Sequence, residues 1–243
     1  MSQMKKFVML LAALACTAGL HAEPVDLHWI DKTPDYKIGQ SWGVPFAKGT
    51  MNDQGTFTLT DASGRYSLNS DKQDGSVFLI TPSGYIARSI DGLRPGFWQS
   101  LYLPAACEEV HDFVLEKQDQ STYTMLMLAD MHLSNDPARD DIRRFTEEVM
   151  PVVRRQAAAA PGAVYTVNLG DTTHDIYWGE FNFNETDGLR LLQDLRYPTP
   201  MYSIMGNHDH APSITGEDVD RRSGWRERDC WGPGQYSVNI GGD

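Results

Sequence analysis

Three short apolar segments, each followed at once by residues of the kinds that bind metal ions, constrain the fold of this chain more than any other feature. The segments are Thr124–Ala129, Ala163–Leu169 and Met201–Met205. The polar residues directly after them are Asp130-Met131-His132, Gly170-Asp171-Thr172-Thr173-His174 and Gly206-Asn207-His208-Asp209. Apolar runs of this length, bounded by turn residues, are typical of buried strands. We therefore expect three strands whose ends bring these polar side chains together.

The stretches between these strands have the periodicity of helices. One apolar face is formed by Ile142, Phe145, Val149, Val152 and Val153, and another by Leu189, Leu192 and Leu195. We expect the first helix to begin at Asp136-Pro137 and to end before Pro161, and the second to be capped by Thr186 or Asp187. Strands that alternate with helices predict a parallel sheet with right-handed crossovers, which binds ligands at the carboxyl ends of its strands. All three polar sets fall at those ends.

Residues 36–115 have a different pattern, that of a small β domain. Alternating or apolar runs at Thr56–Thr60, Arg65–Leu68 and Ser76–Ile80 are separated by the turn residues Asp61–Gly64 and Asp74-Gly75. Short strands at such close spacing predict an all-β sandwich. At the polar segment 117–121 the sequence pattern changes from closely spaced strands to alternating strands and helices. We therefore place a β-sandwich domain at residues 23–118 and an α/β domain at residues 119–243.

Residues 1–22 have the features of a secretory signal peptide. Lys5 and Lys6 precede the apolar run Phe7–Ala15, and small residues lead up to Ala22. The run is too short to span a bilayer, and no later stretch is long and apolar enough for a membrane helix. We expect cleavage after Ala22 and a periplasmic or secreted protein. The alternative is an outer-surface lipoprotein acylated at Cys16.

The charge of the chain restricts its partners. Removal of residues 1–22 takes away two of the 21 basic residues and none of the 33 acidic ones, so the formal net charge changes from −12 to −14. Such an acidic protein is not expected to bind nucleic acid through a general basic surface. If it handles phosphate, bound divalent cations would supply the local positive charge. In an oxidising compartment, Cys107 and Cys230 either pair or remain buried thiols.

The residue types after the three strands suit a two-metal hydrolytic site. Carboxylates, an amide oxygen and imidazoles are ligands for Mn, Fe, Zn or Mg. Two cations about 3.5–4 Å apart can hold a hydroxide and clamp a phosphoryl group for in-line attack. Each motif alone has a simpler explanation, because Asp171 could cap a helix and Asp130 could form a surface pair with His132. His174 is either a neighbour of the ligands or a substrate contact, and His210 reads as a solvated loop residue.

The three motifs together resemble those of the calcineurin-like metallophosphoesterases. The family's pattern is Asp-x-His, then Gly-Asp-x-x, then Gly-Asn-His-Asp/Glu, then a lone His and Gly-His-x-His. The resemblance covers residues 122–243 and implies the first half of an α/β/β/α-type sheet arrangement. It also implies two divalent metal ions, the first bound by Asp130 and His132 and the second by Asn207, with Asp171 bridging both.

The same resemblance implies catalytic roles for the last motif. His208 would stabilise the transition state or protonate the leaving oxygen, and Asp209 would orient His208. In the N-terminal half, Thr58–Leu68 resembles prealbumin-like β-sandwich modules of secreted bacterial proteins. Pro82–Tyr85 and Asp91–Phe97 are similar to the small domain that precedes certain bacterial phosphoesterases of this family.

The chain departs from the family pattern after the third motif. It ends at Asp243, and neither a lone His nor Gly-His-x-His follows Asp209 and its neighbour His210. The resemblance implies that three further imidazole ligands come from this missing part. We expect a fragment of a longer gene product; the alternatives are a truncated pseudoenzyme and half of a split protein. By itself, the 243-residue chain is expected to bind divalent metal weakly and to hydrolyse phosphoesters poorly.

Two functions are consistent with these features. The first is a metal-dependent phosphoesterase that hydrolyses phosphate mono- or diesters, of a small molecule or a lipid headgroup, with a hydroxide that bridges two metals. The second is a non-catalytic exported binding module, in which the β-sandwich acts and the phosphoesterase half is vestigial. Retention of all six residues of the three motifs favours the enzyme, and the absent histidines favour the binding module; the six are Asp130, His132, Asp171, Asn207, His208 and Asp209.

Overall fold

The computed structural model describes residues 50–51, 55–56, 58–69, 76–104, 107–215, 223–234 and 236–241. The predicted signal peptide, its cleavage after Ala22 and the alternative acylation of Cys16 lie outside these residues. The chain folds into two compact units. Of the described residues, those from Thr50 to Pro82 and from Phe97 to Leu115 belong to one unit, and those from Ser83 to Gly96 and from Glu116 onward belong to the other. Among the described residues, no helix has the length and apolarity needed to cross a membrane.

The first unit consists of short antiparallel strand pairs. β1 (Thr50–Met51) pairs with β2 (Gly55–Thr56), and β3 (Ser76–Phe78) pairs with β5 (Trp98–Ser100). The buried residues Val77, Leu79, Ile80 and Phe113 form its core. These short strands are consistent with the strands expected in the N-terminal part of the chain. Their assembly into a β-sandwich stays a prediction.

The turn predicted at Asp61–Gly64 is confirmed. The Asp61 carboxylate accepts the backbone N–H groups of Ser63 and Arg65 at 2.8 and 2.9 Å, as turn-forming aspartates do. The strand expected at Arg65–Leu68 is wrong, because these residues pair with no strand in the described part of the chain. Tyr66 and Leu68 instead pack against the core as side chains, and the Tyr66 hydroxyl donates to the His111 carbonyl at 2.7 Å.

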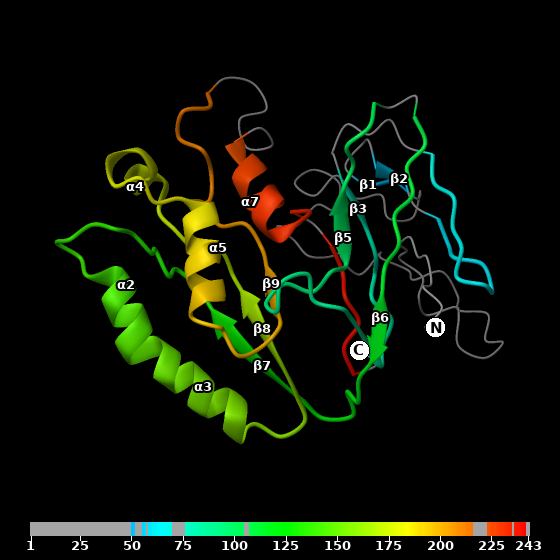
Figure 1. Cartoon of the computed structure of the whole chain (residues 1–243), viewed down its shortest axis with the longest axis horizontal. Helices are drawn as coiled ribbons and strands as arrows, with labels where there is room; N and C mark the ends of the chain where they lie inside the picture. Colours follow the sequence, from blue (N-terminus) through cyan, green and yellow to red (C-terminus); the bar gives the residue numbers. More distant parts are fainter. Residues whose placement is uncertain are drawn as a thin grey trace, which may run out of the picture. The chain divides into compact units, whose positions relative to one another are not determined.

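The second unit is built on a parallel three-stranded sheet in the order β7-β8-β9 (Figure 1). The strands are β7 (Tyr123–Leu128), β8 (Ala163–Asn168) and β9 (Met201–Ser203), close to the three predicted segments. Asn168 at the end of β8 is in register with Leu128 of β7 and Ser203 of β9. The three strands therefore end level, and the residues that follow them emerge at one edge of the sheet.

The first predicted helix begins later than expected. It is made of α2 (Asp141–Arg144), a π-helical turn at Phe145–Val149 and α3 (Met150–Ala159). Asp136 does not cap it; the Asp136 carboxylate accepts the Ala138 N–H at 2.8 Å within a separate turn. Asp140, in the left-handed region with φ 64°, separates that turn from α2. The predicted end before Pro161 is confirmed.

The second predicted helix is α5 (Glu185–Asp194), and its cap is Asn184, so the expected caps Thr186 and Asp187 are wrong. The Asn184 side chain accepts the Thr186 N–H at 3.0 Å, and the Asp187 carboxylate accepts the Asn184 N–H at 3.1 Å. This reciprocal capping box places Asp187 at the third helical position. Two helices that the sequence did not indicate are α4 (Asp175–Glu180) and α7 (Trp225–Trp231).

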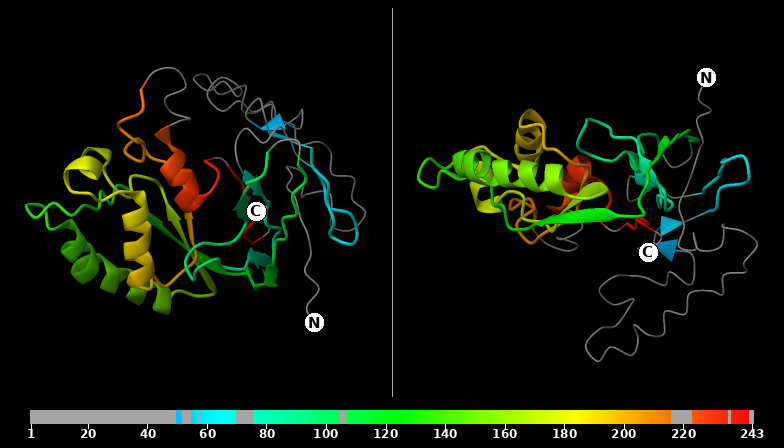
Figure 2. Two further views of the ribbon diagram at one scale, coloured as in Figure 1. Left: turned by 45° about the horizontal axis from the view of Figure 1, so that its top comes forward. Right: turned by 90° about the horizontal axis from the view of Figure 1, so that it is seen from below.

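One face of the sheet carries the core of the second unit. Leu126 and Leu128 of β7 pack on a cluster that includes Met150 of α3 and Leu192 of α5, so both helices cover this face. The alternate residues Met125 and Met127 point to the other face and are 37% and 62% exposed. Figure 2 shows the helices and the sheet from two further directions. This one-sided layering fits part of an α/β domain.

Residues 83–96, which we placed in the N-terminal domain, pack with the second unit. The Met201 N–H donates to the Leu93 carbonyl at 2.9 Å, and Leu93 belongs to the core cluster of the sheet. Within this segment, β4 (Tyr85–Ala87) pairs with β6 (Leu115–Lys117).

Cys230 on α7 is buried, whereas Cys107 is exposed. Burial raises the pKa of the Cys230 thiol to about 12. Its Sγ lies 3.9 Å from the Thr186 hydroxyl, and the side chain packs in the core of the second unit. The expected burial is confirmed for Cys230 and wrong for Cys107, and the pairing of the two cysteines stays a prediction.

Candidate metal centre

The loops that follow β7 and β8 are joined by backbone hydrogen bonds beyond the ends of the strands. Asp130 N–H donates to the Gly170 carbonyl at 3.2 Å, and His132 N–H donates to the Asp171 carbonyl at 2.9 Å. Leu133 then forms a parallel bridge with Thr173. The strand ladder therefore continues into the loops and holds the Asp-x-His motif beside Asp171.

Backbone strain is concentrated in these loops. Asp130, His132 and Asp171 have φ angles of 54°, 46° and 54°, in the left-handed region that residues other than glycine rarely adopt. They are three of the six such residues in the described part of the chain. Strain of this kind persists only where the surroundings enforce it, and it gathers at functional sites. Here the interloop hydrogen bonds enforce it.

Two glycines allow the loops after β8 and β9 to touch. A Cβ on Gly170, whose φ is 94°, would lie 2.4 Å from the backbone nitrogen of Gly206. A Cβ on Gly206 would lie 2.1 Å from Oδ1 of Asp171. The glycines that open the second and third motifs are therefore needed for the position of the Asp171 carboxylate.

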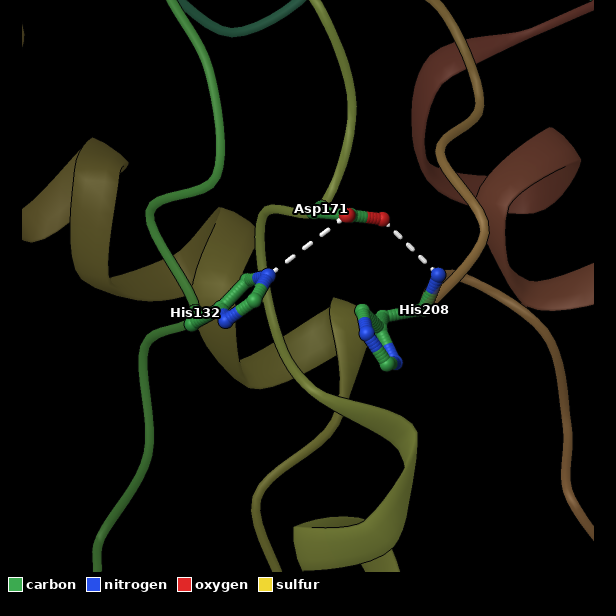
Figure 3. Close-up of side chains that lie close together, drawn as sticks. All are labelled: His132, Asp171 and His208. Carbon is green, nitrogen blue, oxygen red and sulfur yellow. Dashed lines mark hydrogen bonds and ion pairs between the residues drawn. The ribbon is translucent and has the colours of Figure 1, made fainter.

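Asp171 lies at the centre of the site (Figure 3). It is 6% exposed; its Oδ1 accepts the backbone N–H of His208 at 2.8 Å, and its Oδ2 lies 3.5 Å from Nε2 of His132. Ligand atoms of His132, Asp171 and His208 all lie within 4.8 Å of one another. A carboxylate and two imidazoles at this separation, from three different loops, fit a divalent metal ion.

The other two predicted ligands lie at the rim of this group. The Asp130 carboxylate is 3.9 Å from Nε2 of His132, and its side chain is 72% exposed. Asn207 is exposed on the turn before His208. The structure thus brings His132 and Asp171 together and leaves Asp130 and Asn207 at the rim, and metal binding by all four residues stays a prediction.

Asp209 is completely buried and binds backbone groups. Its carboxylate accepts the N–H groups of Asp171, Thr172 and Gly206 at 2.7, 3.2 and 2.8 Å. It therefore clamps the loop after β8 to the loop after β9. The orientation of His208 by Asp209, which the resemblance implied, stays a prediction.

The carboxylate beside the His208 ring is Asp175, the first residue of α4, which sequence reasoning missed. Nδ1 of His208 lies 2.8 Å from Oδ1 of Asp175, and Nδ1 of His174 lies 3.1 Å from the same oxygen. His174, Asp175 and His208 form a second group whose ligand atoms lie within 4.8 Å. Burial lowers the pKa of His174, and the neighbouring His208 and His132 lower it further. The only local signal for Asp175 was its place directly after His174.

Two buried glutamic acids lie behind Asp209. Glu185 accepts the Thr173 N–H and hydroxyl at 3.2 and 2.6 Å, and burial, reinforced by Asp209, raises its pKa well above the ordinary value. Glu227 is 2% exposed, and its Oε2 has no hydrogen-bond partner in the structure as described. Burial raises the pKa of Glu227 well above the ordinary value, with Glu185 and Asp209 adding to the effect. Their helical neighbours gave no sign of this burial in the sequence.

We expect stability of the second unit to fall with rising pH because of Glu227. The pKa of its carboxyl is raised in the folded state, so the folded protein binds more protons than the unfolded chain above the ordinary value of 4.5. Its contribution is therefore complete below that value and is lost as pH rises through the folded pKa. The groups that face it are Glu185, Asp209, Cys230 and Tyr236.

Glu227→Gln keeps the shape of the neutral acid and removes the titration. Its thermal midpoint, followed by circular dichroism with chelator present, should change less than that of the wild type between about pH 5 and about pH 9. Glu180→Gln, at an exposed position of α4, is the control. Parallel pH profiles of Glu227→Gln and the wild type would contradict this account.

Residues 39–118 match a family described as the N terminal of calcineurin-like phosphoesterase. The comparisons with curated proteins and with solved structures found no match. The matched segment precedes the loops that carry the candidate metal centre. This match at residues 39–118 supports the calcineurin-like phosphoesterases as the family of this chain.

Proposed function

We propose that the native gene product is a metal-dependent hydrolase of phosphate mono- or diesters. The observation that carries this proposal is the convergence of two proposed ligands, His132 and Asp171, with the proposed general acid His208 at the carboxyl edge of a parallel sheet, where their side-chain nitrogen and oxygen atoms lie within 4.8 Å of one another. Divalent cations of Mn, Fe, Zn or Mg would be held by Asp130, His132, Asp171 and Asn207. When bound, they would supply a hydroxide nucleophile at neutral pH and offset the charge of the phosphoryl group.

In this proposal, His208 is the general acid. Its side chain is 29% exposed, so a substrate can reach it, and Oδ1 of Asp175 lies 2.8 Å from its Nδ1. A carboxylate that accepts the Nδ1 proton fixes the tautomer and leaves Nε2 to give a proton to the leaving oxygen. Asp175 is thus a positioning residue, and Asp209 supports the ligands through the backbone.

The exposed rim of the site favours a substrate that approaches from solvent. Asp130 is largely exposed and Asn207 lies on an exposed turn, so the proposed cations would face a phosphoester of a small molecule or of a lipid headgroup. We also propose that the protein is exported to the periplasm or to the exterior of the cell. The rival function, a non-catalytic exported module, is favoured by the restriction of the family match to residues 39–118.

A metal-reconstitution experiment tests the two functions. We expect the native gene product, stripped by chelator, to hydrolyse an aryl phosphate or an aryl phosphodiester at about 1–1,000 per second once Mn, Fe, Zn or Mg is restored. Asp171→Asn should abolish this restoration, whereas Asp194→Asn, at an exposed position on α5, should not. A folded protein without turnover in any of the four metals would favour the binding module.

A further inference from the structure

The group formed by His174, Asp175 and His208 has the composition of a metal site. Oδ1 of Asp175 lies 2.8 Å from Nδ1 of His208 and 3.1 Å from Nδ1 of His174. The two imidazole rings are 3.7 Å apart between centroids and inclined by 31°. Two imidazoles and one carboxylate suit borderline cations such as Zn²⁺ better than Mg²⁺ or Mn²⁺.

The distances require little adjustment for coordination. Two ligand atoms at about 2.0–2.2 Å from one tetrahedral zinc ion lie about 3.3–3.5 Å apart. The two nitrogen–oxygen separations in this group are shorter than that by a few tenths of an ångström. The side chains of His174, Asp175 and His208 are 15%, 24% and 29% exposed, so an ion can enter from solvent and water can complete its coordination.

Nδ1 of His174 has two polar neighbours. The backbone N–H of Ile176 lies 3.4 Å away, as a cap of α4, and Oδ1 of Asp175 lies 3.1 Å away. This nitrogen and the Asp175 oxygen are therefore close enough to bind the same cation.

We propose that His174, Asp175 and His208 form a second binding site for a borderline divalent cation, Zn²⁺ being the representative. This site is argued from the positions of the three side chains and does not depend on the proposed phosphoesterase function.

The site is tested with His174→Ser. Serine keeps an acceptor at the N-cap of α4 and removes the imidazole. The control is His210→Ser, which removes a nearby histidine whose Nδ1 meets the Ser223 hydroxyl at 2.7 Å and which belongs to neither group. In equilibrium dialysis of the native gene product against Zn²⁺, the wild type and His210→Ser should bind one more equivalent than His174→Ser.

Nitrogen-15 NMR of the imidazoles identifies the ligand. Zinc should shift the Nδ1 resonance of His208 in the wild type, and this shift should be lost in His174→Ser. The same zinc equivalent and the same shift should persist in Asp171→Asn, which disables the first centre. This measurement can therefore be interpreted even if the phosphoesterase proposal fails.

Equal zinc stoichiometry in the wild type and His174→Ser, or an unchanged His208 resonance, would overturn the site. Loss of the extra equivalent in Asp171→Asn would assign it to the first centre and would overturn the proposal as well.

Discussion

Replacement of His208 by alanine in the native gene product is expected to lower phosphoester turnover by about 100–10,000-fold, the usual contribution of a general acid. Manganese content should stay nearly unchanged, because the first centre is assigned to Asp130, His132, Asp171 and Asn207. Manganese is the suitable probe, since it prefers oxygen ligands over the imidazole-rich second group. Asp171→Asn, in contrast, removes a charge shared by both cations and should lower manganese content together with turnover.

Metal analysis beside steady-state kinetics measures both variants at once. The two variants should differ clearly in manganese content, because Asp171 is 6% exposed and its carboxylate accepts the backbone N–H of His208. If His208→Ala lost its manganese, His208 would be a ligand of the first centre. If Asp171→Asn kept full manganese and normal turnover, the bridging role carried over from the family would be wrong for this chain.

Replacement of Asp209 by alanine is expected to lower the free energy of unfolding by about 3 kcal/mol or more. The change leaves three backbone N–H groups without their acceptor, those of Asp171, Thr172 and Gly206, and each unsatisfied buried group costs about 1–3 kcal/mol. Chemical denaturation in the presence of chelator measures this loss without the contribution of bound metal. Asp175→Ala, at a half-buried carboxylate, should cost less stability and should mainly lower turnover.

The comparison of Asp209 with Asp175 decides which carboxylate orients His208. In the structure, Nδ1 of the His208 ring lies 2.8 Å from Oδ1 of Asp175, whereas the Asp209 carboxylate accepts backbone N–H groups. An Asp209→Ala variant with wild-type stability and strongly reduced turnover would instead support the orientation of His208 by Asp209. Asp194→Ala, at the exposed end of α5, controls for the general effect of losing an acidic side chain.

Local patterns in the sequence were sufficient for the sheet. The apolar runs before Asp130, Asp171 and Asn207 became β7, β8 and β9, because buried strands of this length leave a clear signal between turn residues. Helix boundaries were less predictable. Asp136 formed its own turn and Asn184 outcompeted Thr186 as a cap, since several nearby polar residues could satisfy the same N–H groups. The short helices α4 and α7 contain too few turns for a periodic signal.

The sequence by itself determined that Asp, His and Asn residues meet at one edge of a parallel sheet, because strand direction and period are local properties. Only the tertiary structure decided which side chain meets which. Asp175 faces His208 across 33 residues, and Glu185 faces Thr173 across 12. The burial of Glu185, Asp209 and Glu227 was likewise settled by packing. Partner choice and burial depend on contacts between distant segments, and no local pattern of residues encodes them.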